Sequence, residues 1–163
     1  MSARRPTVVA LDTANLGDRS YIVALDGQAV VVDPQRDIDR LLAILEQNAW
    51  TVTHVVETHV HNDYVSGGLV LAGELGAEYL VPRGHDYQFD ATQVGEGSTF
   101  TSGSTAWRVL HTPGHTPHHV SYAVAVDGED AGVFTGGSML YGSVGLPVLI
   151  GPDATEGLAH AQW

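Results

Sequence analysis

Residues 58–64 read Thr58-His59-Val60-His61-Asn62-Asp63-Tyr64 and follow an apolar run rich in β-branched residues, Val52-Thr53-His54-Val55-Val56. Residues i and i+2 of an extended segment project to the same side, whereas on a helix they point to nearly opposite faces. We therefore expect His59 and His61 to converge on one metal ion where a strand ends. Neutral imidazole is a good ligand for zinc and for iron.

A second histidine cluster lies downstream, in the stretch His111-Thr112-Pro113-Gly114-His115-Thr116-Pro117-His118-His119. Two prolines and a glycine keep this backbone out of regular structure, so we predict a rigid loop. A three-coordinate protein site needs a third ligand from elsewhere in the chain, and His115 is the natural candidate. Surface or hydrogen-bonding roles are expected for the remaining histidines, which are His54, His85, His111, His118, His119 and His160.

The composition of the chain bounds its class. Its 163 residues, of which 44% are hydrophobic and 16% charged, predict one globular domain over residues 1–163. The net charge of -12, from 19 acidic residues against seven arginines and no lysine, disfavours a nucleic-acid or anionic membrane surface. No apolar run approaches the ~20 residues of a membrane helix, and we expect a soluble, cytoplasmic protein. Because the chain has no cysteine, any metal must bind to nitrogen and oxygen.

Hydrophobic periodicity predicts strands interrupted by two helices, which is typical of sheets covered by helices with ligands on the loop ends. Asp26-Gly27 and Asp127-Gly128 are predicted turns, and Asp33-Pro34 is expected to be a turn as well. The predicted strands are Thr7–Leu11, Tyr21–Leu25, Ala29–Val32, Val52–Thr58, Glu78–Val81, Thr105–Leu110, Val120–Val126 and Gly132–Thr135, and the predicted helices are Asp37–Asn48 and Gly67–Gly76.

The two histidine stretches together resemble the metallo-β-lactamase superfamily. Thr58 to Gly68, which reads THVHNDYVSGG, is similar to its persulfide dioxygenase branch, including members fused to rhodanese domains. The resemblance implies an α+β fold, an αββα sandwich with the metal at one edge. It implies that His59, His61 and His115 match the first metal position and that Asp63 matches an aspartate of the second. Persulfide dioxygenases are mononuclear and use non-haem iron to oxidise glutathione persulfide to glutathione and sulfite.

Three features depart from that pattern. Tyr64 stands where many dinuclear members have another histidine, which argues against a second metal. Gly137 lies where the superfamily usually has an aspartate after Thr-Gly, so the carboxylate ligand of an iron site is missing. Residues 142–148 replace a stretch where relatives usually carry an arginine and an aspartate, and the chain stops at Trp163, before the last strand and helix of the usual domain. We therefore expect a domain that is incomplete at its C-terminus or degenerate.

The ligand set leaves more than one chemistry open. We expect one divalent ion, with iron(II) favoured and zinc as the alternative. Three neutral histidines leave zinc its full charge, which lowers the pKa of a bound water to about 7 in the best-known case, so hydrolysis is feasible. Iron sites for oxygen activation usually combine two histidines with one carboxylate, so either Asp63 moves in or iron sits on three histidines. Asp63 is also the nearest candidate general base and thus the predicted catalytic residue.

Three functional hypotheses follow. The first is a mononuclear persulfide dioxygenase acting on glutathione persulfide or a similar thiol-derived substrate. The second is a zinc-dependent thioester hydrolase of the glyoxalase II type, and the third is a non-catalytic module beside a rhodanese domain or partner. Neither nucleic acid nor a membrane is expected as a partner. Absent C-terminal elements would leave an apolar face exposed, which predicts self-association.

Overall fold

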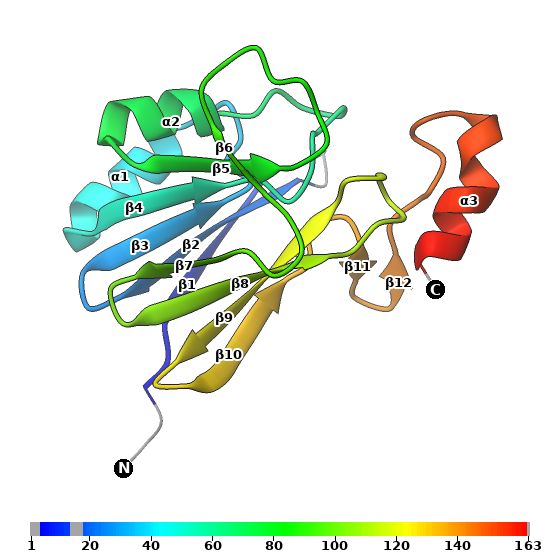
Figure 1. Cartoon of the computed structure of the whole chain (residues 1–163). Coiled ribbons are helices and arrows are strands. Elements are labelled where there is room, and N and C mark those ends of the chain that lie inside the picture. Colours follow the sequence, from blue (N-terminus) through cyan, green and yellow to red (C-terminus); the bar gives the residue numbers. More distant parts are fainter. Residues whose placement is uncertain (1–3, 14–17, 163) are drawn as a thin grey trace.

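Two β-sheets lie face to face in the computed structural model, and two helices cover the outer face of the first sheet (Figure 1). The structure describes residues 4–13 and 18–162. The strands are β1 (Thr7–Asp12), β2 (Arg19–Leu25), β3 (Gln28–Val32), β4 (Thr51–Val56), β5 (Glu78–Pro82), β6 (Thr92–Val94), β7 (Thr99–Ser102), β8 (Thr105–His111), β9 (Val120–Val126), β10 (Glu129–Phe134), β11 (Met139–Leu140) and β12 (Ser143–Val144). The helices are α1 (Asp39–Asn48), α2 (Gly68–Leu75) and α3 (Pro152–Gln162).

The first sheet has six strands in the order β1-β2-β3-β4-β5-β6. Its first three strands pair antiparallel, and β3 to β6 run parallel. The hairpin between β2 and β3 turns at Asp26 and Gly27, whose φ values of 52° and 80° suit a two-residue turn that matches the strand twist. The predicted N-terminal antiparallel strands are thus part of a larger mixed sheet, in which α1 and α2 are the crossover helices between parallel strands.

The second sheet is antiparallel, in the order β10-β9-β8-β7, and β11 and β12 form a separate short hairpin. The predicted turn at Asp127 and Gly128 is confirmed, with φ values of 53° and 82°. Strand β10 begins at Glu129, three residues before the predicted start at Gly132, because its pairing with β9 continues through a register shift between Asp130 and Gly132. An alternation rule applied to the sequence cannot detect such a bulge.

Two apolar cores lie on either side of the first sheet. Strand β3 shows why its sequence is a continuous apolar run: Ala29 and Val31 face the helices, whereas Val30 and Val32 face the second sheet. The core between the sheets also contains the rings of Trp107 and Tyr122, the largest fully buried side chains. A strand buried on both faces is expected where a parallel sheet has helices on one side and a second sheet on the other.

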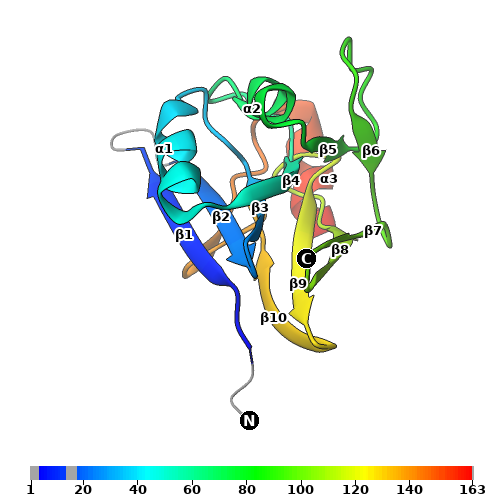
Figure 2. The same ribbon diagram turned by 90° about the vertical axis from the view of Figure 1, so that its left-hand side faces the viewer.

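The helices agree with the sequence expectation in two cases out of three. The helix α1 ends at Ala49 and α2 at Gly76, both with left-handed φ, and a glycine is the usual residue at such a position. The third helix, α3, was not predicted. Figures 1 and 2 show it at the end of the sandwich beside β11 and β12, not over the outer face of the second sheet. Across the described ranges, no helix is long and apolar enough to span a membrane.

The α+β sandwich expected from the resemblance is confirmed, but the strand that leads to the histidine motif is shorter than predicted. Strand β4 ends at Val56, so His59 and His61 lie beyond it and are not placed by strand alternation. The chain leaves the ladder because Thr58 has other partners. Its N–H donates to the carboxylate of Asp33, and its carbonyl accepts from Val120 of the second sheet.

Candidate metal centre

Thr58 joins the two histidine loops. Its carbonyl accepts a hydrogen bond from Val120 N at 2.8 Å, which brings the loop after β4 against the loop before β9. Its N–H and its hydroxyl donate to the two carboxylate oxygens of Asp33, each at 2.7 Å. Asp33 reaches back in this way because it ends β3 with φ at 48°, a left-handed conformation that aspartate tolerates better than most residues.

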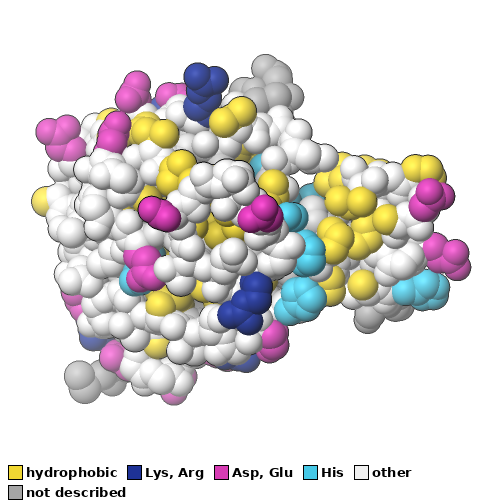
Figure 3. Space-filling view, turned by 45° about the horizontal axis from the view of Figure 1, so that its top comes forward, with side chains coloured by type: hydrophobic (Ala, Val, Ile, Leu, Met, Phe, Trp, Pro, Cys, Tyr) yellow, Lys and Arg dark blue, Asp and Glu magenta, His cyan; other side chains and the backbone are white. Residues whose placement is uncertain are grey.

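Four imidazole rings gather around this junction, with His59 at the centre. The ring of His59 lies 4.0 Å from that of His61, 4.9 Å from that of His115 and 5.0 Å from that of His119, measured between centroids. The three histidines predicted as metal ligands are thus brought together, and His119 is brought to them as a fourth. In Figure 3, histidine side chains line the boundary between the main body and an apolar surface toward the C-terminal segment.

Among the described residues, hydrogen bonding leaves one nitrogen of each predicted ligand without a partner. The Thr58 hydroxyl donates its hydrogen bond to Asp33, so it acts as the acceptor toward His59 Nδ1 at 2.9 Å. The proton of His59 is therefore on Nδ1, and Nε2 keeps its lone pair. The Nδ1 of His115 donates to the carbonyl of Leu146 at 3.2 Å, which leaves its Nε2 free. A ligating histidine is oriented in this way, with its second nitrogen held by an outer partner.

His61 also has one nitrogen held by outer partners, and two of these partners are carboxylates. Its Nε2 lies 3.2 Å from Asp33 Oδ1, 3.3 Å from Glu57 Oε2 and 2.9 Å from the hydroxyl of Tyr64. Tyr64 donates to the carbonyl of Asp33 and can therefore accept from His61. Tyr64 thus hydrogen-bonds beside the site, and Nδ1 is the nitrogen of His61 that remains for a metal.

The charges of this cluster are strongly coupled. Burial alone would lower the pKa of His61, but the charge and hydrogen bond of Asp33, together with Glu57, raise it to about 10. Burial raises the pKa of Glu57, whereas for Asp33 the nearby His61 outweighs burial and lowers the pKa. Burial, followed by the charge of His61, lowers the pKa of His59 to about 2. His59 therefore stays neutral, which is the state a metal ligand needs.

The tightest cluster of ligand-type atoms is not the predicted one. Over residues 4–13 and 18–162, Asp33, Glu57 and His61 form the one group of three or more whose donor atoms all lie within 4.8 Å of one another. The rings of His59, His61 and His115 are neighbours, but their nitrogen atoms do not all lie within 4.8 Å of one another. The two carboxylates, however, are buried and face the Nε2 of His61. The nitrogens of the predicted ligands that have no hydrogen-bond partner within the described ranges, and so could bind a metal, are those of His59, His61 and His115 noted above.

Asp63, the predicted catalytic residue, lies at the outer side of His61. Its Oδ1 is 4.0 Å from His61 Nδ1, and its side chain is 59% exposed. Asp63 also lies near Asp18, whose carboxyl pKa is raised by burial and by the Asp63 charge. Asp63 is thus an exposed carboxylate near the Nδ1 of His61, where it could accept a proton.

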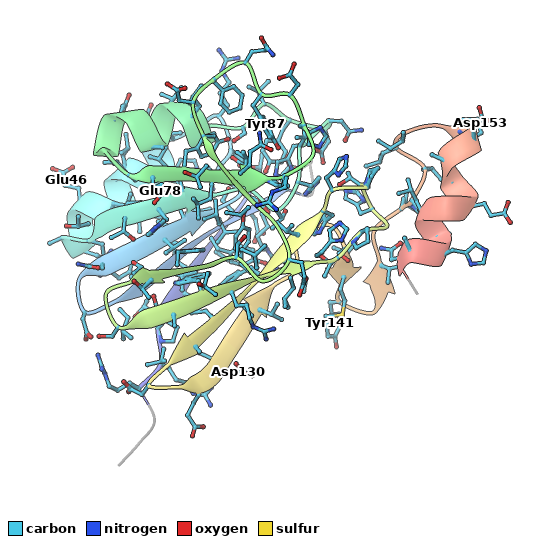
Figure 4. The ribbon with its side chains drawn as sticks, in the orientation of Figure 1. Glu46, Glu78, Tyr87, Asp130, Tyr141 and Asp153 are labelled. Carbon is cyan, nitrogen blue, oxygen red and sulfur yellow. The ribbon has the colours of Figure 1, made fainter. Side chains whose placement is uncertain are left out.

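The position that lacks a carboxylate is filled by a neighbouring ring. A Cβ at Gly137 would lie 2.6 Å from His115 Nε2, and one at Gly145 would lie 2.8 Å from His115 Nδ1. The two glycine backbones therefore enclose the imidazole of His115 between β10 and the β11–β12 hairpin. Helix α3 contacts the segment between β10 and β11, because Gln162 donates a hydrogen bond to the carbonyl of Ser138 at 2.9 Å. In Figure 4, Tyr141 projects into solvent from the tip of the same hairpin.

The sequence analysis did not assign three residues of this cluster to the candidate site. Asp33 was expected to be a turn residue, Glu57 follows an apolar strand without a motif of its own, and His119 was grouped with surface or hydrogen-bonding histidines. His119 does hydrogen-bond, through Nδ1 to Thr112, but it is fully buried, and its Nε2 has no partner within the described part of the chain. Asp33 and Glu57 each directly follow a strand of the parallel part of the sheet, β3 and β4, and a carboxylate at the ends of two neighbouring strands is a signal that the sequence could have given.

This donor set fits a divalent metal ion. It consists of imidazoles whose second nitrogen is held by the Thr58 hydroxyl, by the Leu146 carbonyl or, for His61 alone, by buried carboxylates, and the chain contains no thiolate. Such nitrogen and oxygen donors suit zinc and iron(II) alike. The residues that would hold the ion are His59, His61 and His115.

The comparisons with known proteins identify the family of the chain. The family model described as "Metallo-beta-lactamase superfamily" matches residues 17–136. The chain is 32% identical over 140 residues to the hydroxyacylglutathione hydrolase of Rhodospirillum rubrum, covering 84% of this chain and 50% of that protein. It is 32% identical over 148 residues to glyoxylase B2 of Dictyostelium discoideum, covering 78% and 48%. The chain thus spans about half the length of these curated relatives.

Solved structures show the same likeness. A metallo-beta-lactamase from Staphylococcus aureus superimposes with a TM-score of 0.87 at 27% identity, covering 98% of this chain and 50% of the other. ETHE1 from Myxococcus xanthus superimposes with a TM-score of 0.78 at 28% identity, covering 89% and 64%.

Proposed function

Because the chain belongs to the metallo-β-lactamase superfamily, and its likeness to ETHE1 supports the persulfide dioxygenase-like branch, we propose that it carries a mononuclear metal centre that oxidises a small persulfide. Glutathione persulfide is the substrate we favour. His59, His61 and His115 hold the ion in this proposal, and iron(II) is the preferred metal.

The hydroxyl of Tyr64 carries the mononuclear part of the proposal. It bonds to His61 Nε2 at 2.9 Å and to the Asp33 carbonyl at 3.4 Å, so it supports a first-metal ligand from behind. Burial and the charge of Asp33 raise the pKa of Tyr64, so the phenol stays protonated. A second ion would therefore find neither an anionic ligand at Tyr64 nor a carboxylate at Gly137.

The chain's own residues have distinct tasks in this proposal. When bound, iron(II) would supply redox chemistry toward oxygen, and zinc would supply a Lewis acid. His59 presents a neutral nitrogen, and His61 is oriented by its buried carboxylates. Asp63, exposed and 4.0 Å from His61 Nδ1, is placed to take the proton of an incoming S–H group.

The reaction balances with oxygen and water as co-reactants. One persulfide, one O₂ and one water give one thiol, one sulfite and two protons. The sulfur–sulfur bond breaks, the two sulfur atoms together lose four electrons, and O₂ gains them. The inner sulfur leaves as the thiol and the terminal sulfur as sulfite.

A second candidate function is the hydrolysis of glutathione thioesters. The observation that favours it is the identity of about a third to hydroxyacylglutathione hydrolases over most of this chain. Zinc would serve this reaction, which needs no redox change. A non-catalytic module beside a rhodanese unit is the remaining alternative, and Gly137 is the residue that favours it.

The test is metal analysis of anaerobically purified protein, followed by oxygen uptake on glutathione persulfide and thioester cleavage on a hydroxyacylglutathione. About one iron per chain with oxygen uptake that His115→Ala abolishes is the expected result. His160→Ala, an exposed change on α3, is the matched control and should behave like the wild type. Zinc with thioester cleavage alone would select the second candidate, and protein without metal would overturn both.

A further inference from the structure

Glu57 is a buried carboxylate whose two oxygens face different partners. It directly follows β4 and is only 4% exposed. Its Oε1 accepts hydrogen bonds from Tyr79, at 3.0 Å, and from Ser66. Its Oε2 lies 3.3 Å from His61 Nε2 and has no hydrogen-bond partner among the described residues. The hydrogen bonds from Tyr79 and Ser66 are therefore both accepted by Oε1, and Oε2 faces His61.

A second buried carboxylate faces the same nitrogen. Asp33 is also 4% exposed and lies 3.2 Å from His61 Nε2. Burying a carboxylate is costly unless a charge or hydrogen bonds compensate for it, and burying two beside one imidazole is more costly still. In the metal-free protein a protonated His61 offsets part of this charge; when a metal takes the place of the Nδ1 proton, the two negative charges on one side of the ring would balance the divalent cation on the other side.

Gly137 supplies no negative charge to the site. No carboxylate projects from this position, and the space that one would enter is occupied by the His115 ring. A three-histidine ligand set is neutral, so it leaves the full charge of the ion uncompensated. The nearest buried negative charges in the same cluster are those behind His61.

We propose that Glu57 is a positioning residue for the metal centre: it orients His61 and supplies, one shell behind the ligand, part of the negative charge that Gly137 does not provide. This inference rests on the metal site of the proposed function but not on its reaction. A carboxylate on the second nitrogen of a ligating histidine raises the basicity of the ligand, and its removal typically costs 10- to 100-fold in metal affinity.

The structure around Glu57 is built to hold it. A Cβ at Gly68, the first residue of α2, would lie 2.7 Å from the Tyr79 hydroxyl, so only glycine leaves room for the Tyr79–Glu57 pair. Ser66, which donates to Glu57, also accepts from Gly68 N at 2.9 Å. The start of α2 thus fixes Oε1, and this leaves Oε2 in one place beside His61.

The experiment compares Glu57→Gln with Tyr79→Phe in the full chain. Glu57→Gln keeps the shape and an acceptor for Tyr79 and Ser66 but removes the charge. Tyr79→Phe removes a hydrogen bond to Oε1 and leaves both charge and Oε2. The readouts are the Kd for cobalt(II) and zinc by competition with a chelator, the visible spectrum of the cobalt(II) form, and the Tm of the metal-free protein.

The expected result is a Kd about 10- to 100-fold higher for Glu57→Gln, at unchanged stoichiometry and with an altered cobalt spectrum. Tyr79→Phe should change Tm and raise the Kd less than Glu57→Gln does, because the charge of Glu57 remains, and Glu57→Asp should restore part of the lost affinity. A Kd for Glu57→Gln within about threefold of the wild type would overturn the inference. Loss of one of two bound ions would also overturn it, because Glu57 would then be a ligand itself.

The two proposals fail in different ways. Wild-type protein that binds metal but consumes no oxygen would refute the dioxygenase function and leave the role of Glu57 standing. Metal binding that is indifferent to Glu57→Gln would refute the positioning role and leave the function standing. Wild-type protein that binds neither cobalt(II) nor zinc would refute both.

Discussion

The imidazole of His115 occupies the space into which a side chain at Gly137 would project, with a Cβ there only 2.6 Å from His115 Nε2. Real Cβ atoms do not approach a ring atom so closely, so any larger residue must displace the ring. The absence of a side chain at residue 137 is therefore coupled to the position of a predicted ligand. Glycine here permits a different placement of His115, in addition to removing a carboxylate.

This coupling predicts the effect of Gly137→Ala. The new methyl group should displace His115, weaken metal binding and lower the free energy of unfolding by about 1–3 kcal/mol, the usual range for overpacking. Urea unfolding of the metal-free protein and chelator competition measure the two effects. Gly73→Ala is the control, because nothing lies within 4 Å of a Cβ there and alanine favours the interior of α2 by about 0.5–1 kcal/mol. Equal stability of Gly137→Ala and wild type would show that the ring moves freely.

Thr58→Val should be more damaging than its size suggests. The hydroxyl donates to Asp33 and accepts from His59 Nδ1, so valine leaves two buried polar groups without their partner. We expect a loss of about 2–4 kcal/mol in the free energy of unfolding, from one charged and one neutral hydrogen bond. Thr58→Ser keeps the hydroxyl and should recover most of this stability. If serine were as unstable as valine, retaining the hydroxyl would not preserve stability, and this result would contradict the assignment of the loss to the two hydrogen bonds.

The fold was largely predictable because its strongest signals are local. The hairpin at Asp26-Gly27, the amphipathic helix α1 and the apolar β3 each follow from short-range periodicity and turn chemistry. The helix α3 was missed because its sequence, with Gly157 and few apolar residues, has little amphipathic pattern. It is held instead by tertiary contacts such as Gln162 with Ser138.

The sequence predicted the gathering of histidines but not the residues that support them. The histidine spacing pointed to His59, His61 and His115, and the structure brings their rings together. It does so through Thr58 and its long-range partners, not through the strand alternation that was assumed. Asp33 was predicted only as a turn residue and Glu57 was assigned no role, and only the tertiary structure shows that both are buried against one histidine.

The stability of the metal-free protein should fall in mild acid because of His119. Burial lowers the pKa of this residue to about 4, below its unfolded value near 6.5. A histidine with a lowered native pKa contributes stability above the unfolded pKa, and this contribution is lost as the pH falls from about 6.5 to about 4. The expected slope is about 1.4 kcal/mol per pH unit for this one group. Urea unfolding across that range should therefore show a shallower slope for His119→Gln than for wild type, and parallel slopes would contradict the assignment.

We also predict self-association through the segment from Met139 to Ile150. It exposes eight large apolar side chains, among them Tyr141, which is fully exposed, and Leu146, which is 67% exposed. Contiguous apolar surface of this kind is unusual on a protein that stays monomeric. Size-exclusion chromatography with light scattering should give a mass above that of one chain, which decreases on dilution. Tyr141→Ser combined with Val144→Ser, two exposed changes on the β11–β12 hairpin, should shift the protein toward monomer. A clean monomer at all concentrations would refute the prediction, because these apolar side chains would then stay exposed to solvent without driving association.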